Sequence, residues 1–130
     1  MTPTKHLCIR QTIVRWFIKV RIARWVEDYQ PGIVECELID RLGKRSSFTI
    51  KLPVVTTEQL SSASEFPREG YLPCVAIASS SDDAGRDVIV VDTSLPLQEE
   101  ADGGNTRFEV FADQVIETPR GYDDLAEPGR

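Results

Sequence analysis

A chain of 130 residues, 41% of them hydrophobic and 28% charged, is long enough for one domain with a core and too short for two. No apolar run approaches the roughly 18 residues that cross a bilayer, so the sequence predicts no transmembrane helix. The net charge of −6 argues against a protein that binds nucleic acid over its whole surface.

The N-terminal part of the chain is basic and β-like. Residues 1–26 contain no acidic residue, and residues 1–13 are expected to form a tail or an edge segment. From 14 to 26, apolar residues such as Val20 and Ile22 alternate with other side chains, which predicts a strand. A helix, including one lying on a membrane surface, is the alternative. The many β-branched residues favour the strand.

Two more strands are expected at 33–40 and 46–52, joined by a tight turn. Apolar and polar residues alternate in both segments. Gly43 stands in the turn between them, where a positive φ is expected. The first three strands therefore read as an antiparallel meander.

The remaining chain is read as three strands, one short helix and a tail. A weak helix is expected at 57–63, followed by strands at 71–79, 87–92 and 106–111. Pro73 within its strand indicates an edge or a bulge on one side. Residues 118–130 are rich in Pro, Gly, Asp and Glu and are expected to be disordered.

The predicted fold is mainly β: a small antiparallel barrel or sandwich of about six strands, spanning 14–117, with at most one short helix. Short strands at close spacing with turn residues between them are typical of such folds. The residues expected to be mostly buried are Val34, Leu38, Phe48, Ile50, Cys74, Ile89, Val90 and Phe108.

The stretch from about 18 to 116 contains a Gly hairpin, a strand ending in Lys-x-Pro-Val and a Pro-x-x-Gly turn. The residues of this pattern are Gly32, Glu35, Gly43, Phe48, Lys51, Pro53, Val54, Pro67 and Gly70. Through them the stretch resembles a set of small, uncharacterised bacterial β-rich proteins. The resemblance implies a β fold and brings no activity with it.

Residues for catalysis, metal binding or cofactor binding are not apparent in the sequence. The three cysteines, at 8, 36 and 74, and the one histidine, His6, stand singly, so no zinc site is expected. Neither a nucleophile elbow nor a phosphate-binding loop occurs. We therefore expect a protein that is not an enzyme, with no catalytic residue, metal or cofactor. An odd cysteine count without a secretory leader fits the cytoplasm.

Charge is unevenly distributed along the chain: residues 1–60 carry a net +4 and residues 61–130 a net −10. Two acidic loops account for much of the second value. The leading hypothesis is a protein-interaction module that binds an unknown protein partner through these loops, and an immunity-like protein is one form of it. The candidate partner-binding residues are Asp82, Asp83, Asp87, Glu99, Glu100 and Asp102.

The alternative hypothesis is a barrel that binds single-stranded nucleic acid. Cations and aromatic rings interleave over residues 15–25, and a strip of this kind can track phosphates and stack on bases. The negative net charge makes this partner less favourable than a protein. The residues of this basic strip are Arg15, Trp16, Lys19, Arg21, Arg24 and Trp25.

Overall fold

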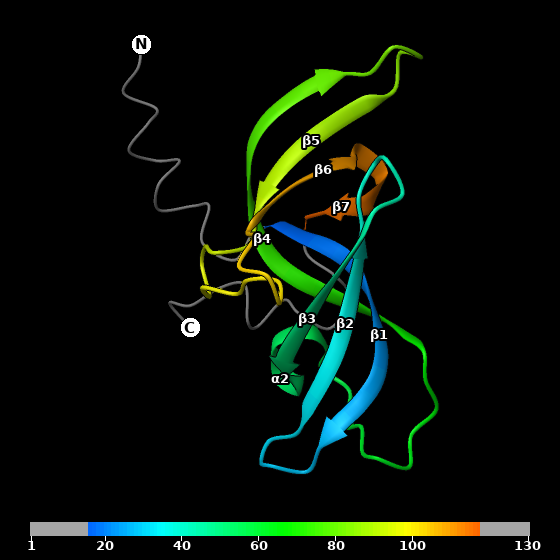
Figure 1. Ribbon diagram of the computed structural model, residues 1–130, viewed down its shortest axis with the longest axis vertical. Helices are drawn as coiled ribbons and strands as arrows, with labels where there is room; N and C mark the ends of the chain where they lie inside the picture. Colours follow the sequence, from blue (N-terminus) through cyan, green and yellow to red (C-terminus); the bar gives the residue numbers. More distant parts are fainter. Residues whose placement is uncertain (1–15, 118–130) are drawn as a thin grey trace.

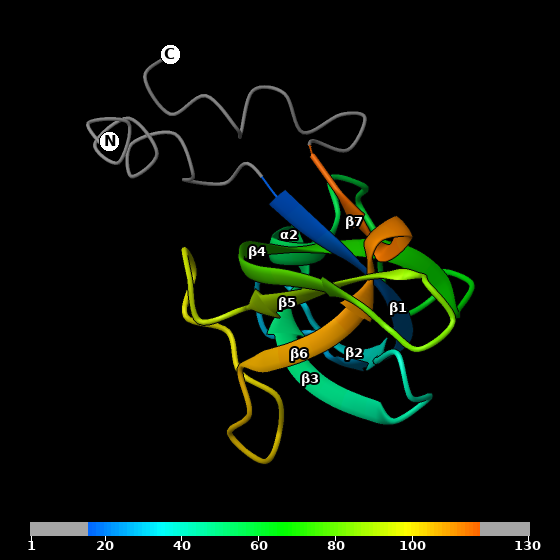
Figure 2. The ribbon, with the colours of Figure 1, turned by 90° about the horizontal axis from the view of Figure 1, so that it is seen from above.

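Strand β1 (Trp16–Glu27) is the centre of a curled antiparallel sheet. The computed structural model describes residues 16–117, and the sheet curls into a half-barrel (Figures 1 and 2). The strand order is β3-β2-β1-β4-β5-β6, and β7 pairs with β1 beside β2. The predicted mainly β, antiparallel fold is confirmed. The other strands are β2 (Ile33–Ile39), β3 (Arg45–Lys51), β4 (Arg68–Ser81), β5 (Asp87–Asp92), β6 (Arg107–Phe111) and β7 (Val115–Ile116).

The core follows from the alternation read in the sequence. Val34, Cys36 and Leu38 of β2 are fully buried, while the residues between them are half-buried. Phe48 of β3 packs against Phe108 of β6, with ring centroids 5.7 Å apart. Burial of these side chains is the main driving force that curls the sheet. The predicted burial is confirmed for Val34, Leu38, Phe48, Ile50, Cys74 and Phe108.

Ile89 and Val90 are half-buried, and they are therefore less enclosed than the other six residues that were expected to be mostly buried. Beyond Cys74, the only strand between residues 16 and 117 that pairs with β4 is β5. Among the described residues no second layer covers the outer face of this extension. An apolar run on both faces of a strand therefore does not mean here that both faces meet the core.

The helix lies earlier in the chain than predicted. Residues 57–63 are not helical; instead α2 (Leu52–Val55) follows β3 directly, with Pro53 in its first turn. Proline is well suited to that position, because it has no backbone N–H and an N–H in the first turn would have no helical partner. In the predicted segment, the Ser61 hydroxyl accepts from the Ala63 N–H at 3.1 Å, a local bond that competes with helix formation. A single 3-10 turn, η1 (Ala112–Gln114), precedes β7.

The two outermost strands of the path are covered by neighbouring loops. The Asp102 N–H donates to the Ser47 carbonyl of β3 at 2.8 Å, and the Arg41 N–H donates to the Glu109 carbonyl of β6 at 2.8 Å. Pro73 lies opposite Phe17 of β1, and on its other side no strand between residues 16 and 117 pairs with it, which agrees with the edge that the sequence indicated. No helix between residues 16 and 117 has the length and apolar character needed to cross a membrane. The predictions for residues 1–15, which include His6 and Cys8, and for residues 118–130 fall outside the described part.

Candidate functional site

The first acidic loop is the turn between β4 and β5, and its leading carboxylate has a structural role. Asp82 Oδ1 accepts hydrogen bonds from the Ala84 and Arg86 N–H groups at 2.9 and 2.8 Å. Asp83 and Asp87 are exposed and form no ion pair with a residue in 16–117. Only these last two carboxylates are therefore wholly available to a partner.

The second acidic loop, between β5 and β6, is tied to the sheet. Asp102 Oδ1 accepts from the Thr49 hydroxyl of β3 at 3.3 Å. Glu99 is half-buried; burial raises the pKa of its carboxyl, against the opposing effect of Lys51. Glu100 is exposed. The turn between β4 and β5 and this loop lie at opposite sides of the molecule in both Figures 1 and 2, so they do not form one surface.

The basic strip is neutralised by the neighbouring strand. Arg24 Nε lies 2.6 Å from Glu35 Oε1, and Arg21 Nε lies 3.5 Å from Glu37 Oε1, with both glutamates on β2. Lys19 is exposed and is in no ion pair with residues 16–117. Arg15 lies outside the described residues. The strip therefore presents little unmatched positive charge to a phosphate chain.

The two tryptophans of the strip are half-buried rather than displayed. A bulge at Ala23 shifts the phase of β1, so that Trp25 pairs with the buried Val34. Trp25 also packs against Gly32, where an added Cβ would approach its ring to 2.6 Å, and its indole N–H donates to Asp28. Trp16 contacts the core cluster from the other end of β1. Neither ring forms an open stacking platform.

Every arginine between residues 16 and 117 interacts with another side chain of the fold. Six are in ion pairs with carboxylates, and the guanidinium carbon of Arg86 lies 3.4 Å from the centre of the Phe111 ring. Many carboxylates have no such partner in this part of the chain. The unmatched charge of the described surface is therefore negative. The six paired arginines are Arg21, Arg24, Arg41, Arg45, Arg68 and Arg107.

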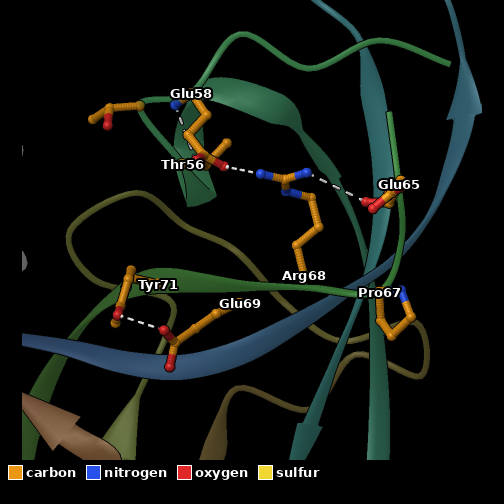
Figure 3. A pocket seen from close by; sticks show the side chains of 8 residues that line it. Thr56, Glu58, Glu65, Pro67, Arg68, Glu69 and Tyr71 are labelled. Carbon is orange, nitrogen blue, oxygen red and sulfur yellow. Dashed lines mark hydrogen bonds and ion pairs between the residues drawn. The ribbon is translucent and has the colours of Figure 1, made fainter. Parts of the chain in front are cut away.

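A polar cleft of about 480 Å³ lies between the loop after α2 and the start of β4 (Figure 3). Arg68 reaches into it from β4. Its Nη2 donates to Glu58 Oε1 at 2.9 Å, and its Nη1 donates to the Glu65 carbonyl at 3.5 Å. Its Nε is buried with no hydrogen-bond partner among the described residues.

Two further side chains from β4 complete the cleft. The Tyr71 hydroxyl donates to Glu69 Oε1 at 2.9 Å, and burial, followed by this bond, raises the pKa of the tyrosine. Glu58, Glu65 and Glu69 give the cleft three carboxylates against the single guanidinium of Arg68. A cleft with this balance attracts a cationic group and repels an anion.

A second cleft of about 610 Å³ adjoins the first and shares the Thr56–Thr57–Glu58 segment with it. Trp25 and Leu60 are among the side chains that line it. The loop after α2 therefore separates two hollows, one mostly charged and one partly apolar. Such a pair can receive a basic side chain beside an apolar one.

The structure holds no sign of a metal centre in the part it describes. No group of three or more His, Cys, Asp or Glu side chains between 16 and 117 is placed to hold a metal ion. Cys36 and Cys74 are free and buried. Burial raises the pKa of each thiol to about 12, which keeps both protonated near neutral pH.

Sequence analysis missed the polar cleft, because its residues come from two segments that the topology brings together. Glu58 follows α2, while Arg68 and Glu69 begin β4. The charged Arg-Glu pair beside Gly70 was the available signal. Gly70 is buried, and a Cβ there would come within 2.9 Å of Ile22, so the chain passes close to β1 at this point.

Comparison of the chain with protein-family models, with curated proteins and with solved structures gives no match. The predicted resemblance to small bacterial β-rich proteins stays a prediction. Function must therefore be argued from the geometry of the chain itself.

Proposed function

We propose that this chain is a non-catalytic protein-interaction module that binds a positively charged segment of a partner protein. The observation that carries the proposal is the asymmetry of charge pairing: the described arginines interact within the fold, whereas many carboxylates remain unmatched. An immunity-like protein, which covers the cationic cleft of a target, is one form of this function. The small size and the net charge of −6 support it.

The cleft around Arg68 is the proposed anchor for one basic side chain of the partner. Glu58 and Glu65 come from the loop between α2 and β4, and Glu69 comes from β4 itself. Loops on a rigid sheet are common binding sites. Asp83, Asp87 and Glu100, farther away, would speed the encounter more than they would tighten the complex.

The test compares two variants with equal change of charge. Glu65→Gln with Glu69→Gln neutralises the cleft; Asp83→Asn with Asp87→Asn neutralises the turn. A lysine- and arginine-rich peptide is titrated into each at low and at raised salt. We expect at least a tenfold loss of affinity, about 1.4 kcal/mol, for the cleft variant and a smaller loss for the turn variant.

Equal losses in the two variants would mean that attraction is only general and that the cleft is not the anchor. A wild-type chain that does not bind the peptide at low salt would refute the proposed function. Single-stranded DNA serves as the competing ligand: tighter binding to it, falling steeply with salt, would favour the basic strip instead.

A further inference from the structure

One backbone edge of the far half of β4 has no strand partner between residues 16 and 117. Residues 68–74 of β4 pair with β1, and residues 75–81 pair with β5. On the side facing away from β5, no strand between 16 and 117 pairs with 75–81. In an antiparallel ladder alternate residues direct both their N–H and C=O groups to each side, so this edge presents unpaired groups. Figure 1 shows this part of the hairpin standing out beyond the rest of the sheet.

The side chains on this edge lack the features that usually prevent pairing. The sequence Val-Ala-Ile-Ala-Ser-Ser-Ser at 75–81 has no charged residue and no proline, and residues 76–81 are exposed. Proteins normally protect such edges with charges, proline or a covering loop. One bulge occurs, at Ile77, and it leaves the regular pairing of 78–81 intact. The strands β3 and β6, by contrast, are covered.

An apolar groove runs beside the open edge. Its volume is about 340 Å³, and Ile77 on its rim is 43% exposed. A strand added to β4 would place its own side chains over this groove. The lining residues are Trp16, Ala76, Ile77, Ala78, Ser79, Ile89 and Val115.

We infer that this edge pairs with the same edge of a second copy of the chain, giving a two-fold symmetric dimer. A two-fold axis through Ala78 makes the two β4 strands antiparallel. Ala78 then faces Ala78 of the second copy, and Ile77 faces Ser79 of the second copy. Because Ser79 lines the groove, each Ile77 reaches the groove of the other molecule.

Charge selects a second copy over another occupant. Like charges directly opposite each other destabilise paired strands, and on the two-fold axis Ala78 lies opposite its own equivalent. The segment 75–81 is uncharged, so neither this pair nor the pairs beside it bring like charges together. A partner chosen for its positive charge would gain nothing from this segment. Since seven paired residues make an interface at or below about 1,200 Å², the dimer is weak and forms only at high concentration.

Sedimentation of the full-length chain, from micromolar to millimolar concentration, tests the dimer without any other partner. The wild type should shift from monomer to dimer across this range. Ala78→Lys places two cations on the axis and should remain monomeric. Ala84→Lys makes the same change on the exposed turn, off the paired edge, and should dimerise like the wild type.

Crosslinking identifies the edge involved. In a Cys8→Ser background, Ala78→Cys should oxidise to a disulfide-linked dimer faster than Ala84→Cys. A wild type that stays monomeric at millimolar concentration, with equal crosslinking of both cysteine variants, would overturn the inference. That outcome would leave the edge to residues 1–15 of the chain or to another protein. Because no basic peptide is present, failure here is distinct from failure of the proposed function.

Discussion

Two hairpin turns of this chain have the same structure and very different surroundings. In both, an aspartate begins a five-residue turn, a glycine stands fourth with φ of 85°, and a cation ends it. Asp40 Oδ1 accepts from the Leu42 and Lys44 N–H groups, as Asp82 Oδ1 does from residues 84 and 86. The first turn joins β2 and β3, which line the core. The second ends the arm, residues 76–87, which has almost no buried residue.

In both hairpins the residues of the turn determine that two strands pair. The rest of the sheet determines whether those strands are covered by other parts of the fold. The first hairpin is in contact with β6 through the Arg41–Glu109 bonds. The arm is attached to the remainder chiefly through β5 and the stacking of Arg86 on Phe111. The core hairpin should therefore report global unfolding, and the arm should open locally.

The largest expected effect is in the core hairpin. Phe48 is fully buried and packs on Phe108, so Phe48→Ala should lower the free energy of unfolding by about 3–5 kcal/mol. Ile77→Ala removes an exposed apolar side chain from the arm and should change it by less than about 1 kcal/mol. Urea denaturation followed by circular dichroism measures both. An unchanged midpoint for Phe48→Ala would contradict the register of β3.

Alkaline pH should destabilise the fold through its buried thiols. Burial raises the pKa of Cys36 and Cys74 from 9.0 to about 12, so the folded state holds these protons more tightly than the unfolded chain. The resulting stability is fully present below about pH 9 and is lost as the pH rises towards 12. Urea midpoints at neutral and alkaline pH measure the loss. Cys36→Ala should make the dependence on pH shallower.

The same thiols sharpen the comparison of the two hairpins. Cys36 lies in β2, and Cys74 lies where the arm leaves β1. If the arm opens locally, a thiol reagent should modify Cys74 before Cys36 in native protein. Mass spectrometry of partly labelled protein gives the order, and equal rates would mean that both thiols are exposed only by global unfolding.

Glycine-to-alanine substitutions should distinguish the two turns through a smaller change in stability. An added Cβ at Gly43 or Gly85 meets no atom within 4 Å, so only the strain at positive φ remains, about 1–2 kcal/mol. Gly43→Ala should lower global stability by that amount. Gly85→Ala should mainly reduce amide protection in 82–87, measured by hydrogen exchange. An equal fall in global stability for both variants would show that the arm does not open on its own.

The smallest effect concerns the turn carboxylates. Asp40→Ala and Asp82→Ala each remove two hydrogen-bond acceptor contacts at a partly exposed site, for about 1 kcal/mol. Asp82→Asn keeps an acceptor oxygen and should retain most of the protection. If Asp82→Asn is as disruptive as Asp82→Ala by hydrogen exchange, charge rather than hydrogen bonding holds the turn.

The sequence was most informative where local patterns decide the structure. The alternation in 33–40 and 46–52 predicted β2, β3 and their buried residues. This works because successive side chains of a strand point to opposite faces, so apolar and polar residues alternate along a half-buried strand. The positive φ at Gly43 followed from the turn residues in the same way. For these elements, neighbours along the chain suffice.

Features that depend on distant contacts could not be read in this way. The half-burial of Ile89 depends on where β4 leaves β1, and the helix at 52–55 depends on how β3 ends. The cleft around Arg68 needs the loop after α2 to lie beside β4. The neutralisation of Arg21 and Arg24 depends on the pairing of β1 with β2. The structural role of Asp82 in its turn could have been predicted from the sequence, since the pattern at 40–44 repeats at 82–86.

The pairing of β7 with β1 bears on how the chain is made. Phe17 lies opposite Ile116 and Ile18 opposite Val115, so the first described strand is completed by the last one. A growing chain on the ribosome exposes β1 long before β7 is synthesised. Until then, one backbone edge at the apolar start of β1 has no strand partner. We therefore expect the pairing of β1 with β7, which joins residues far apart in the sequence, to be the last step of folding. A chain that stops before residue 115 would keep this region open to other nascent chains.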